Sequence, residues 1–340
     1  MTAQTIVPPF IRVLVTDDSL FMRTALTRLI ESDPALKLVG TARNGLEMLE
    51  KAAELEPDVI TLDIEMPVMD GLEALRRLMR ENPRPVIILS SLSEEGAEAT
   101  LKAFDLGAFE CIPKQFSYGA VDIVKMRDDL VAKVKAAAAA TYLRRPKKVA
   151  VPPRAARPAV KAEARGDFPR PAVITMGVST GGPKALAEIL PMLAADLPVG
   201  VLIVQHMPPG FTGPFARRLD SLSKVTVREA TNEDVIEPGL VLLAPAGWHM
   251  TVHRRRNSTC AVRVGKTPAG TLHMPSVDVL MLSVAEVFGA YSMGIILTGM
   301  GADGAQGMKA ICEKGGLTVG RTKLPVSSTG CPAAVPKWVC

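Results

Sequence analysis

The chain has 340 residues, 48% of them hydrophobic and 22% charged, which is enough for two domains with sizeable cores and excludes a chain that is disordered throughout. No apolar run reaches the roughly 18 residues that a membrane span requires, and the first ten residues lack the pattern of a secretory signal, so we expect a cytoplasmic protein that is not embedded in a membrane. The net charge of +5 comes from residues 144–170, which carry nine basic and two acidic side chains, so the rest of the chain is slightly acidic.

The first part of the chain alternates apolar segments of strand type with segments in which apolar residues recur at helical spacing. The predicted strands cover residues 11–16, 38–42, 58–62, 86–90 and 109–112. Helical segments lie between them, and a last one begins near residue 121. This alternation predicts a parallel, doubly wound sheet of flavodoxin-like type, which we expect to span residues 10–130.

Residues 131–169 are predicted to form a linker that contains the basic segment. Its alanine-rich start continues the last helix, and five prolines between residues 146 and 169 then break that helix. Proline and basic residues together favour an extended, solvated chain. Because no aromatic stacking platform or recognition helix accompanies the positive charges, we expect no binding to nucleic acid.

The third part, residues 170–340, is predicted to be a second doubly wound, mostly parallel α/β domain, Rossmann-like with a β insertion. Its predicted strands cover residues 172–177, 199–205, 225–229, 241–243, 250–254, 261–264, 294–298 and 317–319. Four helices are predicted, beginning near residues 183, 215, 277 and 306.

Polar residues follow four of the five predicted strands of the first domain. Asp17 and Asp18 follow the first strand, Asp63 the third and Lys114 the fifth, while Ser90 ends the fourth. These strand ends share one edge of a parallel sheet, where ligands bind. Three carboxylates brought together repel each other, and Mg²⁺ relieves that repulsion. A metal-shielded carboxylate can then attack a phosphoryl donor, with the lysine and the serine hydroxyl binding the phosphoryl oxygens.

The sequence motifs around these residues resemble the receiver domain of two-component response regulators. The motifs are Thr16-Asp17-Asp18-Ser19, Asp63-Ile64-Glu65-Met66-Pro67 followed by Asp70-Gly71, and Ser90-Ser91-Leu92. The resemblance implies that Asp63 is the phospho-acceptor and that Asp18 and Asp63 bind Mg²⁺, with Asp17 acting through water. It also implies that a histidine kinase is the phosphodonor.

A possible nucleophile, Ser179, lies in a tight turn between a predicted buried strand and a helix. Free N–H groups at the start of such a helix can stabilise an oxyanion. A serine hydroxyl needs a base, and His206 ends the next strand, while Asp303 follows another buried strand. Because these strand ends lie at one edge of the sheet, the three residues are predicted to form a Ser-His-Asp triad.

Each of these three residues also has a purely structural interpretation. Ser179 is a suitable helix N-cap, His206 a suitable buried histidine, and Asp303 a suitable turn residue between glycines. The turn around Ser179 lacks the G-x-G-x-x-G spacing of a dinucleotide site.

Metal binding in the third part has little support in the sequence. His249 and His253 are four residues apart, but they lie in a predicted strand, and a metal would need more ligands than the sequence offers there. The five cysteines are widely spaced and include no C-x-x-C pair. This pattern argues against a disulfide framework or a zinc cluster and favours a reducing compartment.

Several motifs of the third part, taken in order, are similar to those of chemotaxis receptor methylesterases. They are Ser179-Thr180-Gly181-Gly182-Pro183, Gln205-His206-Met207-Pro208, Leu243-Ala244-Pro245 with His249-Met250, Pro275-Ser276-Val277-Asp278, and Thr298-Gly299-Met300-Gly301 with Asp303-Gly304. In that family a linker joins a receiver domain to a serine-hydrolase domain. The resemblance implies that Ser179, His206 and Asp303 are the triad and that Thr180 and Met300 line the oxyanion region.

The same resemblance implies a substrate and a mode of control. The substrates would be γ-glutamyl methyl esters of chemoreceptors, and receptor glutamines as well, with no cofactor needed for the esterase reaction. Phosphorylation of the receiver would activate the hydrolase.

One segment departs from the family and motivates another hypothesis. Residues 320–325 carry basic residues where the family has acidic ones. The alternative is a phosphorylation-controlled module that binds receptors with weak or no catalysis. A DNA-binding response regulator is disfavoured, because no helix-turn-helix pattern follows the linker.

Overall fold

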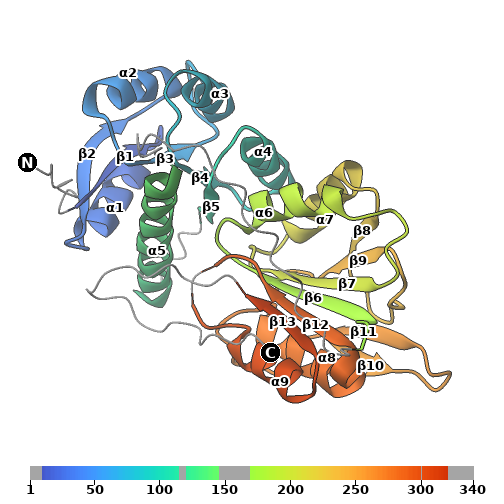
Figure 1. Cartoon of the computed structure of the whole chain (residues 1–340). Helices are drawn as coiled ribbons and strands as arrows, with labels where there is room; N and C mark the ends of the chain where they lie inside the picture. Colours follow the sequence, from blue (N-terminus) through green and yellow to red (C-terminus); the bar gives the residue numbers. More distant parts are fainter. Residues whose placement is uncertain (1–9, 115–119, 145–168, 300, 321–340) are drawn as a thin grey trace, which may run out of the picture. The chain divides into compact units, whose positions relative to one another are not determined.

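The computed structural model of the chain describes residues 10–114, 120–144, 169–299 and 301–320 (Figure 1). It divides into two compact units, Met1–Pro146 and Lys147–Cys340. Met300, most of the predicted linker and residues 321–325 of the departing segment lie outside the described residues.

The first unit is built on a five-stranded parallel sheet with the strand order β2-β1-β3-β4-β5. The strands are β1 (Ile11–Thr16), β2 (Leu36–Ala42), β3 (Val59–Asp63), β4 (Val86–Ser90) and β5 (Glu110–Pro113). The helices are α1 (Leu20–Glu31), α2 (Gly45–Leu55), α3 (Gly71–Glu81), α4 (Glu94–Asp105) and α5 (Ala120–Arg144). This topology confirms the predicted doubly wound sheet.

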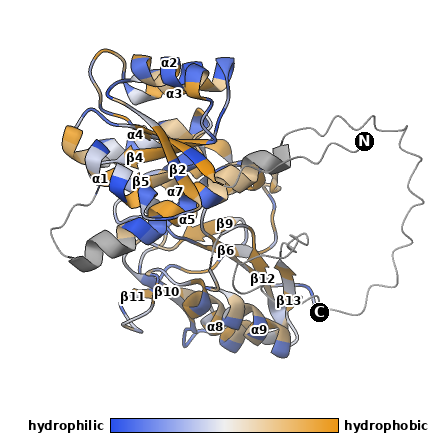
Figure 2. Cartoon of the chain, turned by 90° about the vertical axis from the view of Figure 1, so that its left-hand side faces the viewer, coloured by the Kyte–Doolittle hydropathy of each residue, from blue (hydrophilic) through white to orange (hydrophobic). Residues whose placement is uncertain are grey.

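Local sequence accounts for the elements of this unit. The strands are continuous apolar runs because helices cover both faces of the sheet, and β3 and β4 are buried along their whole length. The helices α1 to α4 begin after side-chain N-caps, supplied in order by Ser19, Asn44, Asp70 and Ser93. Figure 2 shows the contrast between the hydrophobic strands and the hydrophilic outer residues of α2 and α3.

The last helix of the first unit extends further than the predicted domain boundary. The predicted linker starts at residue 131 with a continuation of the last helix, and α5 does run on to Arg144. Leu130, Val134, Ala137 and Ala138 are buried against residues of α1 and the sheet. Residues 131–140 therefore pack with the first unit, because their buried side chains keep helical spacing beyond the predicted boundary.

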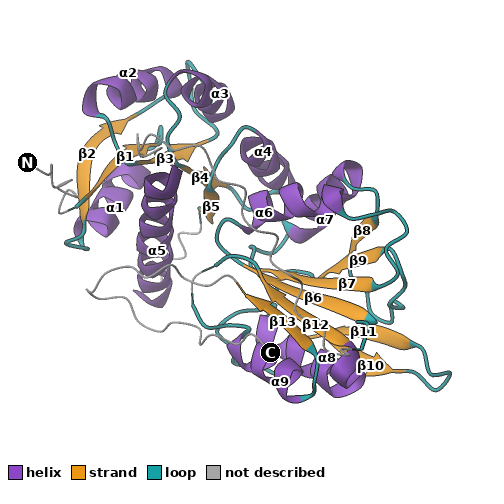
Figure 3. Cartoon of the chain, viewed as in Figure 1, coloured by secondary structure: helices purple, strands orange, loops and turns teal. Residues whose placement is uncertain are grey.

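The second unit is built on a six-stranded parallel sheet with the strand order β13-β12-β6-β7-β9-β8, and an antiparallel pair β10-β11 forms the predicted β insertion (Figure 3). The strands are β6 (Val173–Val178), β7 (Gly200–Gln205), β8 (Thr226–Glu229), β9 (Leu240–Leu243), β10 (His249–Arg254), β11 (Cys260–Gly265), β12 (Ser292–Ile296) and β13 (Leu317–Gly320). The helices are α6 (Gly182–Ile189), α7 (Thr212–Leu222), α8 (Val277–Phe288) and α9 (Ala305–Glu313), with short 3-10 turns at Leu190–Met192 and Gly289–Tyr291.

The strand order places a topological switch point between β6 and β12. From β6 the chain runs outward through β7 on one side of the sheet, and it later returns to β12 on the other side. In doubly wound sheets ligands bind at the carboxyl ends of the strands beside such a point. The loops that carry Ser179 and Asp303 follow these two strands.

Two further features concern the helices and the cysteines. None of the helices among the described residues is long and apolar enough to cross a membrane. Among the described residues, Cys111 and Cys260 have free thiols.

Candidate functional site

Three side chains from separate strand ends of the second unit form a continuous line of hydrogen bonds. The Ser179 Oγ lies 3.2 Å from Nδ1 of His206, and Nε2 of the same ring lies 2.8 Å from Oδ2 of Asp303. Because a carboxylate only accepts, we assign the ring proton to Nε2, which leaves Nδ1 free to accept the serine proton. In the triad predicted from the sequence, His206 is thus within hydrogen-bonding distance of both Ser179 and Asp303.

The backbone around Ser179 is held by its neighbours on both sides. Its N–H donates to the Thr298 carbonyl oxygen at 2.8 Å, and a Cβ at Gly299 would lie 2.7 Å from Ser179 Cβ, so only glycine fits there. Gly181 has a φ of +74°, a left-handed conformation that lets the chain turn sharply into α6. Nε2 of Gln205 donates to the carbonyl oxygens of Ser179 and His206, each at 3.1 Å. The nucleophile and the base are therefore fixed to one another through the backbone as well as through their side chains.

Asp303 is held in place by the start of α8. Its Oδ2 accepts the Val277 N–H at 2.8 Å, and its Oδ1 accepts the Ser276 hydroxyl at 2.8 Å and the Asp278 N–H at 3.0 Å. Burial alone would raise the pKa of this carboxyl, but the hydrogen bonds from His206, Asp278, Val277 and Ser276 outweigh it and hold the pKa well below its usual range. The positive end of the helix dipole acts in the same direction. Asp303 is therefore ionised at neutral pH.

A second histidine covers the base. The rings of His206 and His273 stack with their centroids 4.1 Å apart and an interplanar angle of 20°. Neither His273 nor the role of Ser276 was predicted from the sequence. Ser276 does have the usual sequence signal of an N-cap, a serine directly before an apolar helix, but nothing in that signal shows that it also reaches Asp303.

The predicted oxyanion residues are only partly described. Thr180 directly precedes the turn into α6, and its carbonyl oxygen accepts the Thr298 hydroxyl at 2.9 Å. Met300 lies outside the described residues. Their role in binding an oxyanion stays a prediction.

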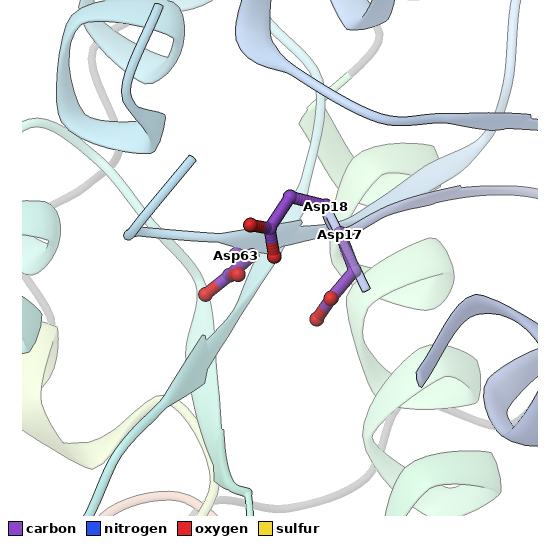
Figure 4. A group of neighbouring side chains, drawn as sticks. All are labelled: Asp17, Asp18 and Asp63. Atoms are coloured by element: carbon purple, nitrogen blue, oxygen red, sulfur yellow. The ribbon is translucent and has the colours of Figure 1, made fainter. Parts of the chain in front are cut away.

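The three aspartates of the first unit gather at the carboxyl edge of its sheet, as Figure 4 shows. One carboxylate oxygen from each of Asp17, Asp18 and Asp63 lies within 4.8 Å of the others. Asp17 and Asp63 are buried, whereas Asp18 is exposed. Oxygen donors at this spacing, open to solvent on one side, suit a Mg²⁺ ion that keeps several of its waters.

Lys114 balances part of this negative charge. Its Nζ lies 2.6 Å from Oδ2 of Asp63 and 3.0 Å from Oδ2 of Asp17. Burial raises the pKa of Asp63 to about 6, with Asp17 adding to the rise and Lys114 opposing it. A cation at this site would therefore favour the ionised form of Asp63.

Ser90 lies at the same edge, but its hydroxyl bonds to α4. The Ser90 Oγ lies 2.7 Å from Thr100 Oγ1 and 3.0 Å from the Gly96 carbonyl oxygen. In this arrangement the hydroxyl makes no hydrogen bond to Asp63 among the contacts of the described residues.

Comparison with known proteins gives matches to both parts of the chain. The family model described as CheB methylesterase matches residues 174–337, and the response regulator receiver domain matches residues 13–125. A protein of Oleidesulfovibrio alaskensis named protein-glutamate methylesterase/protein-glutamine glutaminase 1 is 45% identical, over 96% of this chain and 93% of its own length. A protein of Symbiobacterium thermophilum named protein-glutamate methylesterase/protein-glutamine glutaminase is 47% identical, over 96% of this chain and 91% of its own length.

Two solved structures from Thermotoga maritima also match. The CheB methylesterase catalytic domain is 36% identical, covers 44% of this chain and 79% of its own, and has a TM-score of 0.42. The CheB response regulator domain is 47% identical, covers 38% of this chain and 97% of its own, and has a TM-score of 0.35.

Proposed function

Because this chain belongs to the CheB methylesterase family and carries a response regulator receiver domain, we propose that Ser179, His206 and Asp303 carry out its hydrolysis of receptor glutamyl esters. The protein is a phosphorylation-regulated protein-glutamate methylesterase and protein-glutamine glutaminase that acts in chemotactic adaptation. One observation carries the assignment of the site: the unbroken line of hydrogen bonds from the serine hydroxyl to the aspartate carboxylate.

The reaction follows from the acceptor and donor atoms of the triad. Nδ1 of His206 removes the Ser179 proton as the serine oxygen attacks the ester carbonyl carbon. The tetrahedral oxyanion is held by backbone N–H groups at the start of α6, with Thr180 and Met300 lining the region. Methanol leaves with the proton from His206, and water, activated by the same nitrogen, then releases the free glutamate. With a glutamine substrate the same steps release ammonia.

Asp303 acts on this reaction through the imidazole. It keeps the proton of the neutral ring on Nε2, so that Nδ1 faces the serine as an acceptor. When the ring becomes positively charged, the ionised carboxylate 2.8 Å away stabilises it. In this site Nδ1 faces the serine, whereas chymotrypsin-type proteases use the other ring nitrogen, Nε2. Either nitrogen can perform the proton transfer.

The receiver part of the proposal assigns phosphorylation to Asp63. Asp18 and Asp63 would hold Mg²⁺ directly and Asp17 would hold it through water, and the ion when bound neutralises the charge of the phosphoryl oxygens. Lys114 is close enough to contact the same oxygens, and the Ser90 hydroxyl would turn from α4 to bond to one of them.

The proposed partners follow from the same family. A chemotaxis histidine kinase would donate the phosphoryl group, and the substrates would be the methylated helices of chemoreceptors, both acting in the cytoplasm. The esterase reaction is proposed to need no cofactor, because the triad and the backbone N–H groups supply a nucleophile, a base and oxyanion donors.

Methanol release from methylated receptor membranes tests this proposal. We expect release by the full chain, and faster release when acetyl phosphate and Mg²⁺ are added. The alternative, a receptor-binding module without turnover, predicts receptor binding with no methanol above that of the Ser179→Ala variant. That result would refute the proposed chemistry.

A further inference from the structure

The segment of residues 271–276 touches two members of the triad without taking part in the chemistry. The ring of His273 stacks on His206, and the hydroxyl of Ser276 donates to Oδ1 of Asp303. The orientation of the base and of the acid therefore depends on the shape of this one segment, which runs from the β insertion into α8.

His249, the first residue of β10, is 1% exposed and is hydrogen-bonded to this segment. Its Nδ1 accepts the Ser276 N–H at 3.2 Å, and its Nε2 lies 3.1 Å from the Thr271 Oγ1. The Thr271 hydroxyl in turn donates to the His273 carbonyl oxygen at 2.9 Å. One buried ring thus bonds to both ends of the segment. The Gly247 N–H also donates to the Met274 carbonyl oxygen at 3.0 Å, which attaches the segment near its middle.

The direction of these bonds fixes the state of the ring. The Ser276 amide can only donate, so Nδ1 of His249 must be unprotonated. The proton of the neutral ring is then on Nε2, where it is donated to Thr271, and this leaves the threonine hydrogen for the His273 carbonyl. Burial lowers the pKa of His249, which agrees with a neutral ring, while a hydrogen bond to the backbone of Pro268 and the carboxylate of Asp303 oppose that shift.

We propose that His249 is a positioning residue of the hydrolase, whose neutral ring holds residues 271–276 so that Ser276 meets Asp303 and His273 meets His206. In the sequence this histidine stood out as half of a pair with His253 and as part of a motif shared with the family, but neither pattern gave it a role. His253 instead lies 3.3 Å from a carboxylate oxygen of Glu233. Among the residues that the structure describes, the only candidate group of metal ligands is the aspartate cluster of the first unit.

This role predicts a defect in turnover rather than in substrate binding. An active-site displacement of about 1 Å can lower a rate by as much as about 100-fold. His249→Leu fills much of the same space but removes the hydrogen bonds of the ring, including those to Ser276 and Thr271. We expect it to lower kcat for methanol release by roughly 10- to 100-fold with KM changed less than about twofold.

Two milder variants separate positioning from core packing. His249→Asn keeps an oxygen where Nδ1 accepts the Ser276 N–H, and Thr271→Val removes the hydroxyl that links the ring to His273. Both lose the threonine bridge and keep the serine bond, so both should lower kcat by a similar, smaller factor of about threefold. His253→Leu, on the same strand, is the matched control and should stay within about twofold of the wild type.

Hydrogen–deuterium exchange measures the segment directly and needs no substrate. Peptides that cover residues 271–276 should exchange at least about tenfold faster in His249→Leu than in the wild type, and little faster in His253→Leu. The measurement of kcat rests on the proposed function, whereas the measurement of hydrogen–deuterium exchange does not. A wild-type protein without esterase activity would refute the proposed function. In that case the exchange of residues 271–276 would still decide the inference about His249.

Two results would overturn the inference. One is unchanged exchange in His249→Leu together with kcat within about twofold of the wild type. The other is an equal loss of kcat in both His249 variants with none in Thr271→Val, the pattern of a core residue. If His249→Leu does not fold, the comparison of His249→Asn with Thr271→Val still decides the matter.

Discussion

Replacing Asp303 by asparagine tests how the triad works, because it changes charge and donor pattern while keeping the shape. Oδ2 accepts from His206 and Val277, and Oδ1 accepts from Ser276 and Asp278. The carboxylate satisfies donors on both sides. An amide oxygen can satisfy only one side, and its NH₂ group then faces donors on the other.

Either orientation of the amide damages the site. With the NH₂ toward His206, the ring must accept on Nε2 and carry its proton on Nδ1, where it cannot take the proton of Ser179. With the NH₂ toward Asp278, the amide NH₂ of residue 303 faces the backbone N–H of Asp278. In the wild type this N–H donates to Oδ1 of Asp303 at 3.0 Å, so a hydrogen bond is replaced by two donors that repel each other. In both cases the negative charge that stabilises the imidazolium is lost.

We expect Asp303→Asn to lower kcat for methanol release by about 10⁴-fold, equivalent to about 5.5 kcal/mol of transition-state stabilisation. The assay is methanol release from methylated receptor membranes at pH 7, with circular dichroism to verify that the variant is folded. A folded variant with kcat within tenfold of the wild type would refute the reasoning, because neither the tautomer nor the charge of Asp303 would then matter.

Other consequences of the structure can be checked separately. Ser179→Ala should abolish methanol release without changing the unfolding transition, and turnover near the wild-type rate would remove Ser179 from the mechanism. Asp63→Asn should abolish the rise in activity with acetyl phosphate and Mg²⁺; a rise of normal size would place the acceptor elsewhere. The pKa of Asp303 is depressed in the fold from 3.8, so its charge stabilises the fold above about pH 4 and this contribution is lost as the pH falls further. Urea titrations should therefore show a smaller loss of stability below pH 4 in Asp303→Asn than in the wild type, and equal losses would contradict the shift. Leu130→Ala should cost about 2–5 kcal/mol in the free energy of unfolding of the first unit, since the side chain is fully buried; a loss below about 1 kcal/mol would argue that α5 is not part of that core.

The end of the first unit shows where sequence patterns stop being informative. An alanine-rich helix before a proline-rich stretch was predicted, and α5 does run through it. Whether such a helix is solvated or packed depends on a partner surface, which here includes residues of α1 that lie about a hundred positions earlier. Alanine favours a helix in either setting, so composition alone could not place the boundary.

The sequence by itself determined the two doubly wound sheets and the candidates at their edges, because strand and helix periods are local and parallel strands bring their carboxyl ends together. For the same reason it named Ser179, His206 and Asp303, and the aspartates of the first unit, as neighbours before any distance was known. Only the tertiary structure decided which groups surround them: the N-terminus of α8 around Asp303, the ring of His273 on His206, and the ring of His249 bonded to the Ser276 N–H. Hydrogen bonds and ring stacking depend on distances of a few ångströms between segments that fold together, and no periodicity in the chain records those distances.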